Sequence, residues 1–539
     1  MRDFHLPGRS TAFAANGMCA ASHPIAAQEA VRVLREGGNA VDAASTAALM
    51  LGLLEPAMTG IGGDMFALVW KPGEDKPRGL NGSGRAPAAL DAAMLRDQGH
   101  ETIPLDSPHA TTVPGAIDAF DTLLREHGSL EWADVLAPSI RLAREGHPVA
   151  PKAAHDWTQE GVGKLSGAAR EHFLLDGRAP KPGERFAFPA KAEALERIAK
   201  NGRAGYYEGP VAEDLVSSLN ALGGVHTLDD FANTACTWVE PIHGDYRGAT
   251  LWELPPNGQG ATAILMAKIL EGFDLASLDP FGAERAHLEA ETARLAYHAR
   301  NCLVADADTP GAAERLAHML SDSTVDAMRA RIDPTKMRVD LLAEADALHA
   351  LGPNGAPHRD TIYLTVVDGD RMMVSLIYSV FHAFGGGLAS SQYGINFQNR
   401  GGGFSLVEGH PNELKGGKRP MHTIIPAMLS RGTQPFATFG VMGGQYQSCG
   451  HARAISNLLD YGMDPQAVVD GARSFPQDGK LDVERGYDAK TVAKLSSMGH
   501  AINSDIGPIG GGQMIVLDHD NGCLVGGSDP RKDGIALGY

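Results

Sequence analysis

The sequence predicts an α+β fold, because helical patterns dominate the first two thirds of its 539 residues and strand patterns dominate the last third. Between about residues 115 and 345, apolar residues recur at helical spacing, and most of these segments end in glycine or a basic residue, as helix C-termini prefer. After residue 360, strand-like runs alternate with glycine clusters at 385–387, 401–403, 443–444 and 510–512. No linker marks the change, which suits one core shared by both parts.

Two helices in series are expected near the N-terminus. In SHPIAAQEAVRVLREGG, Ser22 is a candidate N-cap and the Gly-Gly pair a stop signal. The Ala-rich segment from Asn39 to Glu55 follows and carries Asp42. It is too short and too charged to cross a bilayer, so it predicts a buried helix and no membrane partner.

A glycine-rich loop and a strand come next. EPAMTGIGGDMFALVW predicts a strand over Met65–Trp70 after three glycines, and LNGSGRAPAAL predicts a further loop. The clearest helical patterns then cover residues 116–128, 132–146, 190–202, 261–273 and 283–305.

The segment HRDTIYLTVVDGD opens the strand-rich part of the chain. β-branched and aromatic residues from Thr361 to Val367, followed by an Asp-Gly turn, predict a hairpin strand. Thr361 can simply begin this strand. Alternatively it is a nucleophile that becomes active at a new chain terminus, where its own α-amino group, with a reference pKa of about 7.7 to 8.0, acts as the base. That chemistry requires the bond between Asp360 and Thr361 to break.

Composition and charge exclude several classes of protein. The formal charge is -18 and the pI about 5.6, whereas a nucleic-acid surface needs an excess of lysine and arginine, so no nucleic-acid partner is expected. Apolar residues make up 43% and charged residues 21%, as in ordinary folded proteins.

The cysteine pattern predicts reduced thiols. Five cysteines are scattered along the chain without CxxC pairs or zinc-site spacing, so no metal site is expected. The first residues lack the apolar run of a secretory signal. We therefore expect a cytoplasmic protein.

Several segments together resemble the gamma-glutamyltransferase family of N-terminal-nucleophile hydrolases. The likeness extends over nearly the whole chain and is specific where GGNAVDAA, GIGGD and the nucleophile strand occur together. The remaining segments that carry it are HPIAAQEAVRVLREGG, EPAMTGIGGDMFAL, GRAPAAL, VPGAIDAF, LPPNGQGATAI, VSLIYSVFHAFGGGL, GINFQNRGGGF, GKRPMHTIIPAML, FGVMGGQYQ and SDPRKDG.

The resemblance implies a four-layer αββα sandwich and a proenzyme that cuts itself between Asp360 and Thr361. The fragments 1–360 and 361–539 would stay associated, in a possible homodimer, and act on a small-molecule amide through an acyl-Thr361 ester. Ser379 matches a second hydroxyl that supports the nucleophile, although a plain strand serine fits the residues equally. Gly443 and Gly444 match the paired glycines of the oxyanion hole, although a plain turn is their commoner role. No cofactor is needed, because nucleophile, base and oxyanion donors all come from the chain.

The chain departs from the family where a γ-glutamyl head group binds. Ser83 stands at the family's carboxylate-binding arginine, with Arg85 two residues on. The family holds the α-amino group with an acidic residue in an Asp-Asp-Phe segment, which is Gly402-Gly403-Phe404 here. Phe381 stands where an asparagine is expected. A Ser-Ser pair is replaced by His422-Thr423.

These departures favour an acylase-like amide hydrolase. Arg85, Arg400, His382 and His422 are candidates to bind an acyl group that carries a carboxylate but no amine. An exposed loop arginine at Arg400 and structural histidines at His382 and His422 fit the residues equally. The segment 404–418 is shorter than a lid-bearing version, which favours hydrolysis over transfer. Two alternatives remain: a true gamma-glutamyltransferase or glutathione hydrolase that uses Arg85, and a binding protein on the same fold without catalysis.

Overall fold

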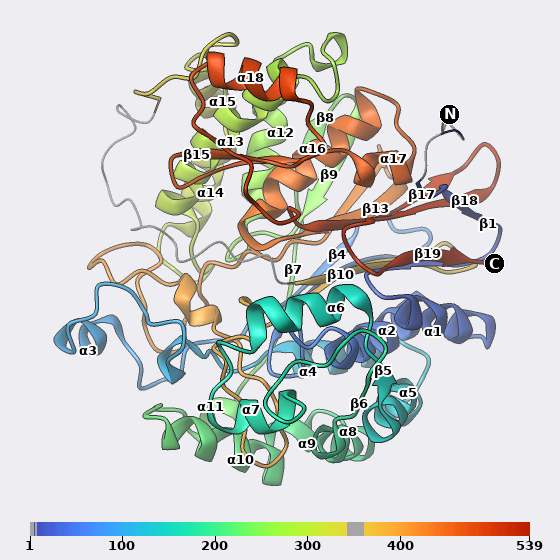
Figure 1. The fold of residues 1–539 in the computed structure, drawn as a ribbon, viewed down its shortest axis with the longest axis vertical. Coiled ribbons are helices and arrows are strands. Elements are labelled where there is room, and N and C mark those ends of the chain that lie inside the picture. Colours follow the sequence, from blue (N-terminus) through green and yellow to red (C-terminus); the bar gives the residue numbers. More distant parts are fainter. Residues whose placement is uncertain (1–4, 6–7, 342–360) are drawn as a thin grey trace.

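A computed structural model describes residue 5 and residues 8–341 and 361–539. Two seven-stranded antiparallel sheets lie at its centre, and helices cover both outer faces (Figure 1). Sheet A has the order β1 (Ala12–Ala14), β18 (Cys523–Ser528), β17 (Gly511–Asp518), β13 (Gln434–Met442), β12 (Ala427–Arg431), β9 (Ala249–Glu253), β8 (Ile242–Tyr246). Sheet B has the order β19 (Ile535–Gly538), β2 (Met18–Ala21), β10 (Ile362–Val367), β11 (Met373–Ser379), β3 (Asp64–Trp70), β4 (Arg78–Gly82), β7 (Thr237–Val239).

One helical layer covers sheet B. It forms the larger apolar core with the outer face of that sheet, and buried alanines of the first two helices allow close packing. Its main members are α1 (Pro24–Arg35), α2 (Ala40–Leu54), α4 (Ala116–His127), α5 (Trp132–Glu145), α8 (Pro189–Asn201) and α10 (Gly209–Ala221).

The other helical layer covers sheet A, and its apolar side chains form a second core with the outer face of that sheet. Its main members are α12 (Gly260–Glu271), α13 (Ala283–Leu303), α14 (Ala312–Leu320), α15 (Asp322–Arg329), α16 (Gln447–Leu459) and α17 (Pro465–Asp470). A third apolar cluster, which includes Phe66, Tyr363 and Met428, fills the space between the sheets. The molecule is therefore the expected four-layer αββα sandwich.

The expected elements are confirmed with small shifts at their ends. The helices predicted at 116–128 and 283–305 are α4 and α13, and the strand predicted over Met65–Trp70 is β3. One local expectation was wrong. His23, not Ser22, caps α1 by accepting the N–H of Ile25, while Ser22 donates to Glu55 at 2.5 Å.

Residues before 342 and after 360 interleave in both sheets. In sheet B, β2 pairs with both β10 and β19, and β3 pairs with β11. In sheet A, β1 pairs with β18, and β9 pairs with β12. Strands from both parts of the chain therefore belong to the same two sheets.

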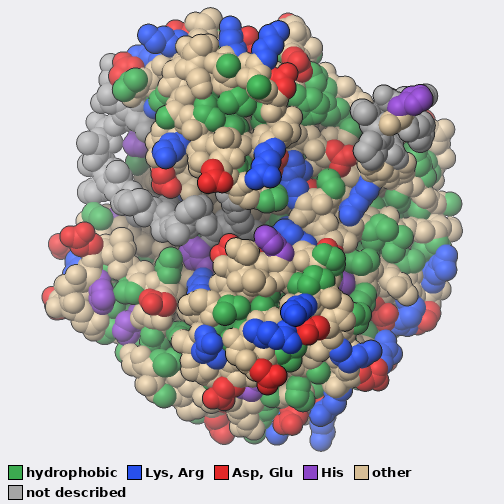
Figure 2. Space-filling view, viewed as in Figure 1, with side chains coloured by type: hydrophobic (Ala, Val, Ile, Leu, Met, Phe, Trp, Pro, Cys, Tyr) green, Lys and Arg blue, Asp and Glu red, His purple; other side chains and the backbone are tan. Residues whose placement is uncertain are grey.

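The surface mixes charges of both signs. Lysine and arginine side chains lie among aspartate and glutamate side chains across the face shown in Figure 2. Within the described ranges, no helix combines the length and apolar character needed to cross a membrane.

Candidate active site

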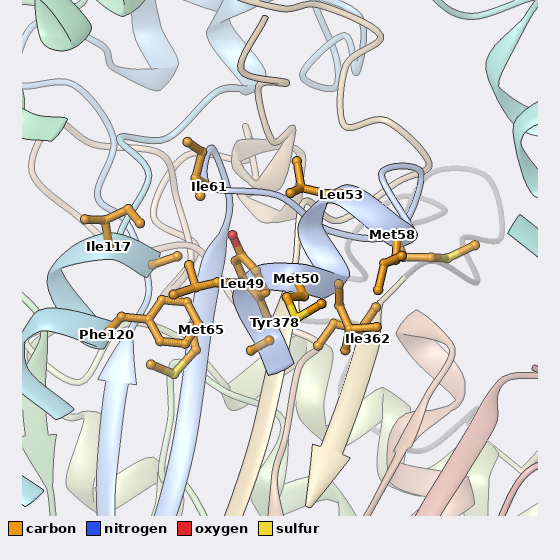
Figure 3. Close-up of a cluster of buried hydrophobic side chains, with 14 of the residues drawn as sticks. Leu49, Met50, Leu53, Met58, Ile61, Met65, Ile117, Phe120, Ile362 and Tyr378 are labelled. Carbon is orange, nitrogen blue, oxygen red and sulfur yellow. The ribbon is translucent and has the colours of Figure 1, made fainter. Parts of the chain in front are cut away.

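Three neighbouring strands of sheet B present polar side chains at one end. Ile362 of β10 lies opposite Tyr378 of β11, and Ser379 lies opposite Asp64 of β3. Ile362 and Tyr378 point into the core under the helices (Figure 3). Because side chains alternate between the two faces of a strand, Thr361, Ser379 and Asp64 point the other way, toward sheet A.

Thr361 is hydrogen-bonded to Ser379. The threonine Oγ1 donates to the serine Oγ at 3.1 Å, and both side chains are fully buried. The serine Oγ also accepts the N–H of Phe381 at 2.9 Å and, at 3.4 Å, an N–H from Nη2 of Arg400. The nucleophile candidate is therefore oriented by a hydroxyl that is itself fixed from two further directions.

Asp64 is the central acceptor behind this pair. The glycine before it permits the close approach of β3 to β11, because a Cβ at Gly63 would lie 2.3 Å from the carbonyl oxygen of Ser379. The carboxylate of Asp64 is fully buried. It accepts hydrogen bonds from the N–H groups of Gly84 and Gly115, from Nε2 of Gln398 and from His422, over 2.9 to 3.1 Å.

Arg400 is a fully buried arginine next to Ser379. Its Nη1 donates to Thr423 Oγ1 at 2.9 Å, and its guanidinium carbon lies 4.1 Å from the centroid of the Phe381 ring. Within residues 8–341 and 361–539, no carboxylate pairs with this guanidinium, and its Nε has no acceptor. Burial lowers the pKa of Arg400 to about 9, against an opposing attraction from Asp64, so the group is still charged at neutral pH.

His422 is buried and neutral. Burial and the charge of Arg400 lower the pKa of His422 to about 3, although Asp64 opposes this shift. Its Nε2 lies 3.1 Å from Asp64, and its Nδ1 accepts the N–H of Ile424 at 3.3 Å, so the geometry assigns the proton to Nε2. The ring therefore positions Asp64, and both of its nitrogens are engaged.

Gly443 and Gly444 follow β13, a strand of sheet A that packs against β10. Both have positive φ, 123° and 56°, which glycine adopts without strain. Nε2 of Gln259 donates to the carbonyl of Thr423 at 2.7 Å and to that of Gly444 at 3.1 Å. Its Oε1 accepts from Arg300 at 2.8 Å. One side-chain amide thus connects the glycine pair with the segment that holds the buried arginine.

Two other predicted residues, Ser83 and Arg85, contact other side chains. Ser83 is buried, and its Oγ accepts from the side-chain amide of Asn257 at 3.0 Å. Arg85 is 35% exposed in its side chain and forms ion pairs with Asp306 at 3.5 Å and Asp308 at 3.3 Å. The charge of Arg85 is therefore already compensated, unlike that of the buried arginine.

The loop after β11 carries the remaining predicted residues. Phe381 has a positive φ of 81°, an uncommon conformation for a side chain of this size and one that often marks a functional site. The N–H of His382 donates to Oδ1 of Asn399 at 3.1 Å, and its ring packs on Phe381. Asp360 lies outside the described residues.

The described ranges contain no group of three or more His, Cys, Asp or Glu side chains arranged to hold a metal ion.

Comparison with known proteins fits this geometry. The family model for gamma-glutamyltranspeptidase matches residues 26–539. The chain belongs to the gamma-glutamyltranspeptidase family. It is 35% identical to a glutathione hydrolase-like YwrD proenzyme of Bacillus subtilis, across 97% of this chain and 98% of that protein. It is 31% identical to an oxamate amidohydrolase proenzyme of Klebsiella pneumoniae, with the same coverage.

A solved structure is also similar. The cephalosporin acylase from Bacillus halodurans superposes with a TM-score of 0.88 at 36% identity, covering 100% of this chain and 99% of that one. The relatives of this gamma-glutamyltranspeptidase-family chain therefore include acylases and amidohydrolases as well as proteins named for glutathione.

Sequence reasoning missed three residues of the site. Asp64 stands in the quoted GIGGD motif and Gln259 in NGQG, but neither motif reveals which backbone groups its polar side chain will reach. Asn399 adjoins Arg400 and was also passed over. A polar side chain directly after glycine was the available signal for the first two.

Proposed function

We propose that this chain is a self-processing amide hydrolase in which Thr361 becomes an N-terminal nucleophile. The observation that carries the proposal is the hydrogen bond from Thr361 to Ser379 at the end of two paired strands. It belongs to a continuous set of contacts that runs through Arg400 and Thr423 to the loop of Gly444.

Self-cleavage would begin with Oγ1 of Thr361 attacking the carbonyl carbon of Asp360. The C–N bond breaks as the C–O ester forms, and the nitrogen gains a proton to become a free amine. Water then hydrolyses the ester, which restores the hydroxyl and leaves a carboxylate on Asp360. The new α-amino group can deprotonate the neighbouring hydroxyl.

Catalysis would repeat the same chemistry on a substrate amide. Thr361 Oγ1 attacks the carbonyl carbon, the proton passes through the α-amino group to the leaving amine, and an acyl-threonine ester forms. Water hydrolyses that ester. N–H groups of Gly443 and Gly444 would stabilise the oxyanion in both halves, and one such donor contributes about 2.7 to 4 kcal/mol.

A true glutathione hydrolase is less well supported. Its γ-glutamyl substrate carries an α-amino group that needs a carboxylate, and glycines occupy those positions. A Cβ at Gly403 would lie 2.6 Å from the carbonyl oxygen of Met421, and one at Gly402 would lie 2.3 Å from a side-chain carbon of Leu105. The Met421 backbone leaves no room for a side chain at Gly403, whereas a side chain at Gly402 would require that of Leu105 to move. The acylase and amidohydrolase relatives favour an acyl group other than γ-glutamyl.

The test is a denaturing gel and mass spectrometry of purified wild type, Thr361→Ser and Thr361→Ala. We expect two fragments, residues 1–360 and 361–539, for the first two proteins, and an intact, inactive chain for Thr361→Ala. A wild-type chain that hydrolyses amides while still continuous at Thr361 would refute the mechanism. An uncut chain that binds amides without hydrolysing them would favour the binding protein.

Three finer expectations remain predictions: the cytoplasmic location, the homodimer and the preference for hydrolysis over transfer. Comparison of acyl release with and without an added amine acceptor tests the last of these.

A further inference from the structure

We infer that Arg400 binds a carboxylate of the substrate, and that the substrates are monoamides of short dicarboxylic acids with the carboxylate close to the carbonyl that Thr361 attacks. The inference rests on the proposed function, because it specifies the acyl group of that reaction. It separates Arg400 from Arg85, His382 and His422, which the sequence left as equal candidates.

The first argument is the isolation of a buried charge. A guanidinium without solvent exposure loses its hydration, and proteins normally compensate such a charge with an anion. The charge of Asp64 raises the pKa of Arg400, but its oxygens already accept four hydrogen bonds, and it makes no ion pair with this arginine. An anionic substrate group would supply the missing partner.

The second argument is the orientation of the guanidinium. Stacking on the Phe381 ring fixes its plane, and the hydrogen bonds to Thr423 and Ser379 fix its rotation within that plane. These two bonds use two of the five N–H groups of an arginine. The Arg400 guanidinium is therefore planar, held in one orientation, and keeps further N–H groups for a ligand. These features suit a carboxylate, which binds guanidinium through two parallel hydrogen bonds.

The third argument is distance. Nη2 of Arg400 lies 3.4 Å from Ser379 Oγ, which lies 3.1 Å from Thr361 Oγ1, so guanidinium and nucleophile are at most about 6.5 Å apart. A bound carboxylate oxygen needs about 2.8 Å to the guanidinium, and an attacked carbonyl carbon needs about 3 Å to Oγ1. A short acyl chain meets both requirements. A longer chain must fold back on itself, or its carboxylate or its carbonyl carbon leaves the required position.

The experiment compares wild type with Arg400→Met on paired substrates. The acids are the p-nitroanilides of oxalic, malonic, succinic and glutaric acid, and the neutral partners carry a methyl group in place of the carboxylate. For each substrate the ratio of kcat/KM in wild type to that in Arg400→Met is measured, so the intrinsic reactivity of the amide cancels.

We expect a ratio of about 10- to 150-fold for the shortest acids, as for loss of hydrogen bonds to a charged group. It should fall along the series. For the neutral amides it should be smaller and the same throughout, because they lose only the hydrogen bond from Arg400 to Ser379. Arg400→Lys keeps the charge without the fork and should retain part of the preference for acids. Equal ratios for acids and neutral amides, or a ratio that rises with chain length, would overturn the inference.

Failure of the proposed function looks different, since then neither set of amides is hydrolysed and Thr361 is not released as a terminus. If Arg400→Met is not cut, wild type and Arg400→Lys decide the question. A wild type that hydrolyses the neutral amides as readily as the acids refutes the role of Arg400, while the mechanism at Thr361 stands.

Discussion

Replacing Asp64 with asparagine tests whether this buried carboxylate organises the site. One carboxylate oxygen accepts from Gly84, Gly115 and Gln398, and the other faces His422. An asparagine offers one acceptor and one donor group. Whichever way its amide is turned, an NH2 group meets at least one existing donor.

The more favourable orientation turns the NH2 group toward His422. That ring must then move its proton from Nε2 to Nδ1, where it meets the N–H of Ile424. One unsatisfied buried donor costs about 1 to 3 kcal/mol, and the remaining bonds lose their charge assistance. The neighbouring guanidinium of Arg400 also loses the attraction that supports its charge. We expect the free energy of unfolding to fall by about 2 to 4 kcal/mol.

Asp42 is a matched control. It is also fully buried and accepts four hydrogen bonds, from the N–H groups of Asn39, Ser129 and Leu130 and from the Ser129 hydroxyl, at 2.6 to 3.1 Å. It caps α2, at the far end of that helix from the glycine-rich loop. Asp42→Asn should lower stability by a similar amount and leave the Thr361 site intact.

The assay measures urea unfolding, the rate of self-cleavage and kcat/KM on one short acid amide for both variants. We expect similar stability losses, with cleavage or turnover reduced about 10-fold or more in Asp64→Asn alone. If both variants undergo self-cleavage at similar rates and have similar kcat/KM, Asp64 only stabilises the fold, and the reasoning that it supports Arg400 and His422 fails.

Three further changes give separate outcomes. Burial lowers the pKa of Lys191 to about 7, so below pH 7 the folded state holds a buried ammonium. Lys191→Met should therefore raise the free energy of unfolding by about 2 to 4 kcal/mol at pH 6. This gain should shrink as the pH rises toward 10, where the lysine also becomes neutral in the unfolded chain. Gln259→Leu removes both hydrogen bonds that connect Gly444 to the buried arginine's segment, so kcat should fall about 10-fold or more for acid and neutral amides alike. Gly63→Ala brings a methyl group against the carbonyl of Ser379, which should cost about 1 to 3 kcal/mol and slow self-cleavage.

The glutamine and glycine changes each have a control variant. The control for Gln259→Leu is Gln466→Leu. It removes a buried side-chain amide that bonds the backbone of Ser528 and not the glycine pair, so it should leave kcat unchanged. Gly369→Ala adds a methyl group with no heavy atom within 4 Å and should be neutral. For Lys191, a stabilisation that does not change between pH 6 and pH 10 contradicts the assigned pKa.

The sequence predicted the elements better than the site. Periodicity found α4, α5 and α13 within a few residues of their ends, because the apolar residues of α4 and α5 pack in the core beside sheet B and those of α13 in the core beside sheet A. It also pointed to Thr361 and, through the family resemblance, to Ser379 beside it.

The remaining contacts depend on tertiary approach, which local patterns do not encode. Arg85 and Arg400 looked equivalent as sequence candidates. Arg85 pairs with the buried Asp306 and the exposed Asp308, whereas Arg400 is buried on a phenylalanine ring. The roles of Asp64 and Gln259 depend on backbone groups that are distant along the chain. Only the folded structure distinguishes these cases.

The interleaving of strands has a consequence for how the molecule regains its shape after denaturation. An uncut chain refolds as a single molecule, at a rate independent of its concentration. After a break at Thr361, β10 and β11 can regain their places between β2 and β3 only when two separate polypeptides meet. Refolding of the cut protein should then be second-order and become slower on dilution. A chain that is cut only after it has folded avoids this bimolecular step.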